Sequence, residues 1–132
     1  MNCFSPQMSE QEVNKISMLG LAHVGDGVYE LLIRTMLCAQ GHSAAGELHR
    51  LTVAQVKAPA QARAMEKLLP LLTEEELALY KRGRNAHVHG VPQGAKVGEY
   101  HAATGLEALF GWLYLLGRGE RIQELFAAVM EE

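Results

Sequence analysis

The chain has 132 residues, with 12 Lys and Arg against 15 Asp and Glu and a formal net charge of −3. This length favours one domain, and 48% hydrophobic with 20% charged residues argues against disorder and against a coiled coil. No apolar run reaches the roughly 20 uncharged residues of a membrane-spanning helix, no secretory signal is visible, and two cysteines make neither a disulfide framework nor a four-ligand zinc site. We therefore expect a small soluble protein of the reducing cytoplasm.

The first elements are predicted to be helices. Ser9 and Glu12 fit a capping box that opens a short helix within an N-terminal extension of residues 1–16. From Ser17 to Gln40 the apolar residues recur three and four positions apart, which predicts a long amphipathic helix. Gly41 follows as the expected C-terminal cap.

The middle of the chain predicts two further helices. Ser43 is expected to cap a segment that continues to Val56. Pro59 follows, and proline is tolerated in the first turn of a helix, so the next helix is expected over 60–69.

The remaining elements complete an all-α prediction. Thr73 and Glu76 form a second capping box, which opens a helix toward Asn85. Residues 87–98 contain three glycines and a proline and predict an irregular segment, followed by helices over 100–116 and 120–130. No run alternates long enough to predict a strand, so we expect six or seven helices in one domain spanning 1–132.

Positive charge gathers in one part of the sequence. Residues 77–98 contain four basic side chains, two histidines and no acid. Because phosphate contacts depend on particular Lys and Arg residues, a chain of net negative charge can still present a surface that binds a polyanion. The alternative is a solvated surface with chance clustering of charge.

Two acidic residues lie within apolar helices. Asp26 is flanked by Gly25 and Gly27, and glycine inside a helix permits close approach of another helix or of a ligand. The alternative for this face is a solvated polar stripe with a Glu30–Arg34 ion pair.

Glu107 is harder to explain as a surface residue. It is the only charged residue between Tyr100 and Gly117. Burying an unpaired carboxylate costs several kcal/mol, so Glu107 is expected to face a cleft, a metal ion or a buried cation; the alternatives are a structural pair with an arginine and chance exposure. Two carboxylates on two apolar helices suit a hard cation such as Mg²⁺.

The histidines suggest a competing metal site. His87 and His89 stand two apart in the irregular segment, with His101 further along. Without a nearby third ligand this spacing is weak support for zinc, and contact with phosphate or solvent is the favoured reading.

Three segments, in this order and at these separations, resemble the ribonuclease III family. Residues 24–30 (VGDGVYE) are similar to the Gly-Asp segment of its catalytic domains, and residues 106–115 (LEALFGWLYL) to the second acidic helix. Residues 82–86 (RGRNA), with 56–58 (VKA) and Gln61-Ala62 upstream, resemble the Mini-ribonuclease III branch, a catalytic domain without a double-stranded-RNA-binding domain.

The resemblance implies an all-helical endonuclease that forms a homodimer and cleaves double-stranded RNA with Mg²⁺, leaving 5′-phosphate and 3′-hydroxyl ends. The branch is associated with maturation of 23S ribosomal RNA precursors. It implies that Asp26 and Glu107 are catalytic residues and metal ligands, and it makes Glu30 a secondary catalytic candidate. The residues that it implies for RNA binding are Lys57, Arg82, Arg84 and Asn85.

Two positions depart from the larger enzymes of the family. Those enzymes carry further acids where this chain has Ala22 and Thr104, so two carboxylates are expected here and the number of metal ions stays open. The alternative function is a non-catalytic protein on the same fold that binds double-stranded RNA or the ribosome. A helical dimer without a role in nucleic-acid binding is a third possibility, although it gives the acid-free residues 77–98 no purpose.

Overall fold

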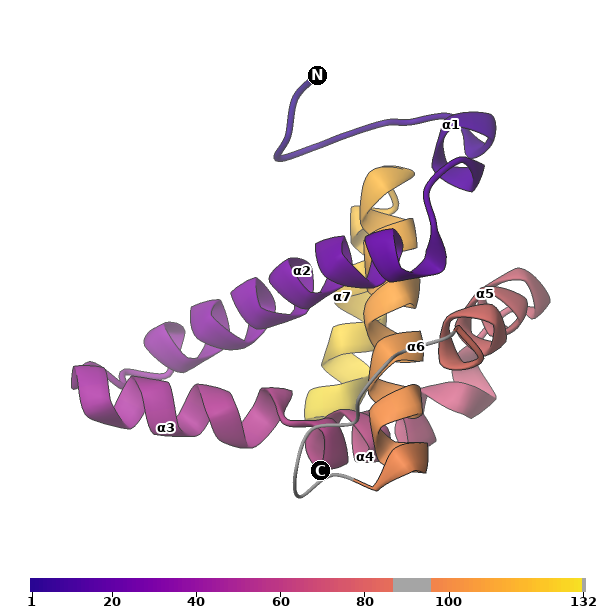
Figure 1. The fold of residues 1–132 in the computed structure, drawn as a ribbon. Helices are drawn as coiled ribbons and strands as arrows, with labels where there is room; N and C mark the ends of the chain where they lie inside the picture. The colour runs from indigo at the N-terminus through magenta and orange to yellow at the C-terminus, as the bar shows by residue number, and fades with distance from the viewer. Residues whose placement is uncertain (87–95, 132) are drawn as a thin grey trace.

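The computed structural model describes residues 1–86 and 96–131, and within these ranges every regular element is helical (Figure 1). The α-helices are α1 (Glu10–Asn14), α2 (Met18–Ala39), α3 (Ala45–Val56), α4 (Ala58–Leu68), α5 (Glu74–Arg84), α6 (Val97–Leu115) and α7 (Gly119–Met130), with a short 3₁₀ turn, η1 (Leu69–Leu71), after α4. The all-α prediction with six or seven helices is confirmed. None of the helices in the described ranges has the length and apolar character needed to cross a bilayer.

Several helix ends follow the expected local rules. Ser9 Oγ accepts a hydrogen bond from the backbone N–H of Glu12, and the Glu12 carboxylate accepts one from Ser9 N–H. Thr73 and Glu76 exchange the same two bonds at the start of α5. Gly41 has a φ of +98°, the left-handed conformation in which a glycine ends a helix such as α2. These three predictions from local sequence are confirmed.

The predicted N-terminal cap of α3 is wrong. Ser43 does not cap a helix: α3 starts at Ala45, and its N-cap residue is Ala44, which has no side-chain hydrogen bond. The turn before α3 is instead closed by a contact between His42 Nδ1 and the Glu47 carboxylate.

The last long helix begins earlier than expected. α6 starts at Val97, where the Glu99 carboxylate accepts a hydrogen bond of 3.3 Å from the backbone N–H of Lys96. Residues 97 and 98 are therefore helical. Residues 87–95 of the predicted irregular segment, which include His87 and His89, lie outside the described residues.

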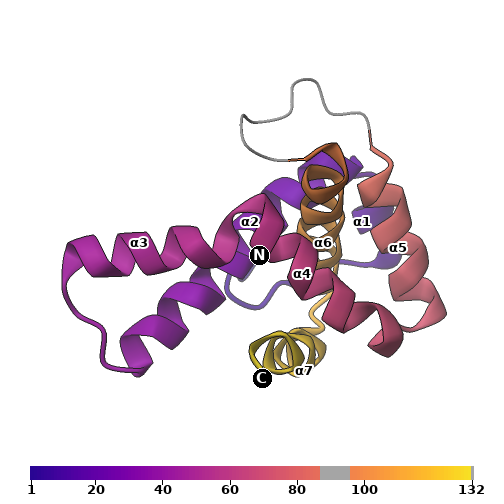
Figure 2. The same ribbon diagram turned by 90° about the horizontal axis from the view of Figure 1, so that it is seen from below.

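The central element is α6, which is surrounded by other helices. Figure 2 shows α6 between α2, α4 and α5, with α7 alongside, and α2 and α3 as a hairpin that projects from this body. Leu106, Leu109, Phe110 and Leu113 of α6 are completely buried. Tyr29 of α2 packs edge to face on Phe110, with ring centroids 5.3 Å apart. Burial of α6 on nearly all sides explains why its sequence is almost free of charge.

Candidate active site at the crossing of α2 and α6

Two glycines bring the backbones of α2 and α6 into direct contact. A methyl carbon added to Gly25 would lie 1.6 Å from the backbone oxygen of Glu107, and one added to Gly111 would lie 2.0 Å from the backbone oxygen of Leu21. No side chain fits at either position without separation of the two helices. The close approach suggested by Gly25 is therefore that of another helix, whereas Gly27 has open space around it.

The crossing places Asp26 beside Glu107. Asp26 follows Gly25 directly, and its carboxyl group is close enough to that of Glu107 to raise the pKa of Glu107. Asp26 is exposed, whereas Glu107 is partly buried, so the pair has one side toward solvent and one toward the helices. Two acids 81 positions apart in the sequence thus share one site.

The surroundings of the pair disfavour a second negative charge. The pKa of Glu107 is raised from 4.5 to about 8. Burial is the larger cause, and the nearby Asp26 carboxyl is the smaller one. Within residues 1–86 and 96–131, none of the ion pairs involves Glu107. The expected alternative, a structural pair between Glu107 and an arginine, is not what these residues form.

The site fits a divalent cation by its donor chemistry. When one of two neighbouring carboxyl groups is partly buried, a nearby positive charge favours ionisation of both. Carboxylate oxygens are the protein ligands that Mg²⁺ takes, together with retained waters. Clusters of three or more Asp, Glu, His or Cys side chains that could hold a metal ion do not occur among the described residues.

Ala22 and Thr104, the two positions where the resemblance implies acids in larger enzymes, are both buried in this chain. Ala22 is buried at the crossing, and Thr104 is buried with its hydroxyl donating to the backbone oxygen of Tyr100 at 3.1 Å. Neither residue can add a carboxylate to the pair.

Glu30 lies one turn beyond Asp26 and is engaged elsewhere. Its carboxylate pairs with Arg34 at 3.2 Å, and both side chains are well exposed. The pair predicted as the alternative reading of this helix face is thus present, and the structure does not bring Glu30 into contact with Glu107.

The candidate RNA-binding residues lie on two elements. Lys57 is exposed at the elbow between α3 and α4, and the others stand at the C-terminal end of α5. Arg84 lies over the Tyr80 ring at 5.7 Å and donates to Asn85 Oδ1 at 3.3 Å. Arg82 lies toward α1 instead, in a cavity of about 180 Å³ shared with Glu10.

Glycines also hold α5 against α6. A methyl carbon at Gly83 would lie 2.7 Å from Ala108 Cβ, and one at Gly105 would lie 2.6 Å from the Tyr80 ring. This contact places the Arg84 end of α5 against the same helix that carries Glu107. Arg84 and Asn85 thus follow directly after the residue of α5 that packs against Ala108 of α6.

A residue without an assigned role completes the site. Gln61 of α4 is 2% exposed, and its side-chain amide is near enough to Glu107 to lower the pKa of that carboxyl slightly, although Nε2 makes no hydrogen bond in the described structure. The buried face of α4 also contains Ala64, Met65 and Leu68, so Gln61 is the polar member of an apolar stripe. That interruption is the sequence signal by which Gln61 could have been found.

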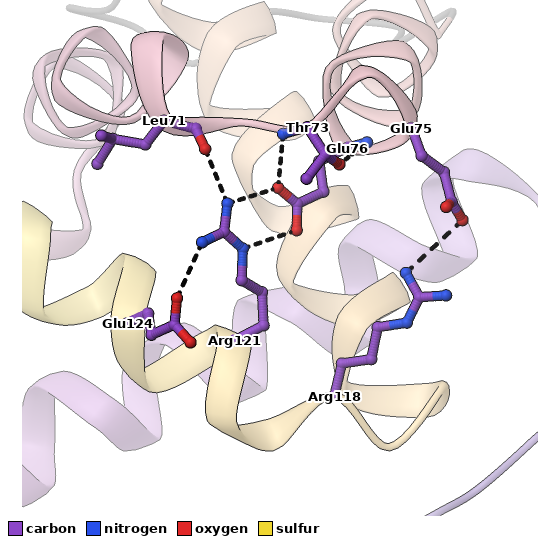
Figure 3. A network of polar contacts seen from close by, with 7 residues as sticks. All are labelled: Leu71, Thr73, Glu75, Glu76, Arg118, Arg121 and Glu124. Carbon is purple, nitrogen blue, oxygen red and sulfur yellow. Dashed lines mark hydrogen bonds and ion pairs between the residues drawn. The ribbon is translucent and has the colours of Figure 1, made fainter.

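Glu76 is a second buried carboxylate, and its charge is balanced by an arginine. Figure 3 shows Glu76 of α5 beside Arg121 of α7: Arg121 Nε donates to Oε2 at 2.9 Å, and Nη2 donates to Oε1 at 2.8 Å. Arg121 also donates to Leu71 O and to Glu124. These hydrogen bonds, with smaller help from Thr73, hold the pKa of Glu76 below its usual value despite burial. Glu76 ties α5 to α7.

Comparison with known proteins finds similarity over most of the chain. Residues 19–118 match the ribonuclease III domain family, a range that includes both crossing helices. Mini-ribonuclease 3 of Symbiobacterium thermophilum is 44% identical over 113 residues, which are 86% of this chain and 87% of that protein. Mini-ribonuclease 3 of a Thermoanaerobacter species is 44% identical over 128 residues, 95% of this chain and 90% of that one. A protein of Fusobacterium nucleatum with an X-ray crystal structure has a TM-score of 0.78 and 34% identity, with 86% of this chain and 91% of that chain covered.

Proposed function

Since the chain belongs to the ribonuclease III family, in its Mini-ribonuclease III branch, and is an endoribonuclease, we propose that it hydrolyses double-stranded RNA at the Asp26–Glu107 pair with Mg²⁺. The observation that carries the proposal is the glycine crossing that brings Asp26 beside Glu107, with none of the ion pairs of the described chain involving Glu107. We propose products with 5′-phosphate and 3′-hydroxyl ends, and a role in maturation of 23S ribosomal RNA precursors in the cytoplasm.

Asp26 and Glu107 would hold the metal ion in this proposal. When bound, Mg²⁺ supplies charge neutralisation at the cleaved phosphate and lowers the pKa of a coordinated water. Asp26 is exposed and therefore accessible to a phosphodiester, whereas Glu107 is partly buried on a helix that is otherwise largely buried. Glu30, one turn away on α2, is the secondary candidate for orienting a water.

The RNA backbone is proposed to contact Lys57, Arg82, Arg84 and Asn85. A-form RNA is recognised chiefly through its shape, phosphates and 2′-hydroxyls, so a basic surface without base-reading groups is sufficient. Among the ion pairs of the described chain, none involves Lys57, Arg82 or Arg84, which supports their availability for phosphate.

We also propose a homodimer through the exposed face of α2. Val24, Val28 and Leu31 line an apolar cavity of about 350 Å³ with Tyr114 and Phe4, and Leu31 is 58% exposed. An apolar patch of this kind on a small protein is typical of an interface. Sedimentation equilibrium tests this point, and a monomer for Leu31→Glu beside a dimer for the unchanged protein is the expected result.

The alternative is a non-catalytic RNA-binding protein on the same fold. It would need the basic surface, and it would have no use for two carboxyl groups held in contact without a cation. The retained acid pair therefore favours the enzyme.

The experiment is incubation of the purified protein with an end-labelled RNA duplex in Mg²⁺ and in EDTA. Asp26→Asn should lower the cleavage rate more than about a thousand-fold, because the lost charge stabilisation is worth several kcal/mol. Its circular dichroism spectrum and its binding to the duplex should be retained, and Glu66→Gln on the exposed side of α4 should cleave normally. Full activity of Asp26→Asn, or cleavage in EDTA, would contradict the proposal.

A further inference from the structure

Gln61 has a combination of burial and missing hydrogen bonds that packing alone does not explain. The residue is 2% exposed, and its Nε2 has no hydrogen-bond partner in the described structure. A buried donor left unsatisfied costs about 1–3 kcal/mol, and a leucine of similar size would avoid this cost. An orphaned buried donor in a folded protein calls for a specific explanation.

The neighbour of Gln61 provides that explanation. Gln61 lies one turn into α4, which packs along α6, and its amide is close enough to the Glu107 carboxyl to favour the charged form of that group. Asp26 approaches the same carboxyl from α2 and acts in the opposite direction. Glu107 is therefore influenced in opposite directions by an acid of α2 and an amide of α4.

The chemistry of the two groups makes the contact dependent on the state of Glu107. An ionised carboxylate only accepts hydrogen bonds, and a neutral amide nitrogen donates two. A bond from N–H to a charged carboxylate is shorter and about twice as strong as one between neutral groups. Nε2 of Gln61 thus finds its best partner when Glu107 is charged, which is the state that binds a metal ion.

We propose that Gln61 is a positioning residue, which donates Nε2–H to the Glu107 carboxylate and fixes its orientation toward a divalent cation shared with Asp26. The inference rests on the proposed metal site at this pair. Groups that hydrogen-bond a metal-bound ligand orient it and pre-organise the site, so their loss weakens metal affinity without removing a ligand. α4 then takes part in the site although it supplies no carboxylate.

The test is the affinity for Mn²⁺, measured without RNA by the electron paramagnetic resonance signal of the free ion. Gln61→Leu should bind Mn²⁺ about 10- to 100-fold more weakly than the unchanged protein. Its melting temperature without metal should be unchanged or higher, because the orphaned donor is gone. Gln61→Met, which also lacks the donor, should behave in the same way and serves if Gln61→Leu does not fold.

Two controls separate this inference from the proposed function. Gln55→Leu, an exposed glutamine on α3, should leave Mn²⁺ affinity unchanged. Glu107→Gln should abolish the site; if it binds Mn²⁺ like the unchanged protein, both proposals are overturned. If Glu107→Gln loses binding while Gln61→Leu and Gln61→Met keep full affinity, only the role of Gln61 is overturned. A lower melting temperature with unchanged affinity would likewise show that Gln61 only packs.

Discussion

Glu76 and Glu107 are both removed from bulk water, and the protein treats them in opposite ways. Glu76 receives two hydrogen bonds from Arg121 and one from a backbone N–H, and its pKa is lowered. Glu107 faces a second carboxyl group, and its pKa is raised to about 8. The first carboxylate joins two helices, and its charge is satisfied within the chain. The second is left in need of a cation, which is the property expected of a metal ligand rather than of a structural residue.

The largest loss of stability and activity should come from a substitution at the crossing of α2 and α6, which brings Asp26 beside Glu107. Gly25→Ala places a methyl carbon against the backbone oxygen of Glu107, and backbone atoms cannot move aside as a side chain can. We expect a loss of about 3 kcal/mol or more in the free energy of unfolding, and loss of cleavage, because α2 and α6 must separate.

The matched control is Gly46→Ala on α3, where nothing lies within 4 Å of the added carbon. This change should stabilise the protein by about 0.5 kcal/mol and leave cleavage unchanged, because alanine is the better helix former. Urea unfolding of both variants decides the matter, and a harmless Gly25→Ala would show that the crossing is not as tight as described.

Removal of Arg121, the partner of Glu76, should have the next largest effect. Arg121→Ala leaves Glu76 buried without its partner and should lower the free energy of unfolding by about 3 kcal/mol, at the low end for buried pairs because Arg121 is partly exposed. Cleavage per folded molecule should be unchanged. If Arg121→Ala instead removed activity from a protein of normal stability, the division between structural and catalytic carboxylates would be wrong.

The pH dependence of stability should separate the two carboxylates further. The pKa of Glu107 is raised in the folded state, so its contribution is fully present below the unfolded value of 4.5 and is lost as pH rises toward about 8. Metal-free protein should lose about 3 kcal/mol of stability between pH 5 and 8 through this group. Glu107→Gln should remove that loss, and Mg²⁺ should stabilise the unchanged protein more at pH 8 than at pH 6. Equal pH profiles for the two proteins in EDTA would contradict the raised pKa.

The smallest effect concerns the other end of α5. Arg84 lies over an aromatic ring and is absent from the ion pairs of residues 1–86 and 96–131. Arg84→Ala should weaken duplex RNA binding. The slope of log K against the logarithm of the salt concentration should fall by about 1, the value for one lost phosphate contact. Arg118 is the matched control, because it also lies over a ring but pairs with Glu10 and Glu75. An unchanged salt slope for Arg84→Ala, measured by gel shift, would remove Arg84 from the RNA-binding surface.

Local sequence predicted the parts of the fold that depend on neighbouring residues. The capping boxes at Ser9 and Thr73 and the glycine end at Gly41 are set by contacts within a few positions, and the structure contains all three. Ser43 is not a cap, because α3 begins one residue later, after Ala44, and the side-chain contact at this turn is between His42 and Glu47. The capping preference of serine alone did not predict this turn, because the prediction did not consider the side chains of His42 and Glu47.

Contacts between distant residues were accessible only in part. Glu107 could be singled out because a lone charge in an apolar helix is conspicuous, and the family resemblance supplied Asp26 as its partner. The sequence could not show that Glu76, and not Glu107, pairs with an arginine, because Arg121 is 45 positions away. The roles of Gln61 and Gly111 depend on how α4 and α2 pack on α6; Gln61 left a signal as the polar member of an apolar stripe, whereas Gly111 left none.

The most direct test of the acid pair is a carbon-13 NMR titration of the Glu107 carboxyl, assigned by its absence in Glu107→Gln, with and without Mg²⁺. In metal-free protein the pKa should be about 8, because burial and the Asp26 carboxyl both favour the neutral form. Saturating Mg²⁺ should move this pKa far downward, since the ion binds the charged form. An ordinary pKa near 4.5 that does not respond to Mg²⁺ would contradict the claim that these two carboxyl groups form a divalent-cation site.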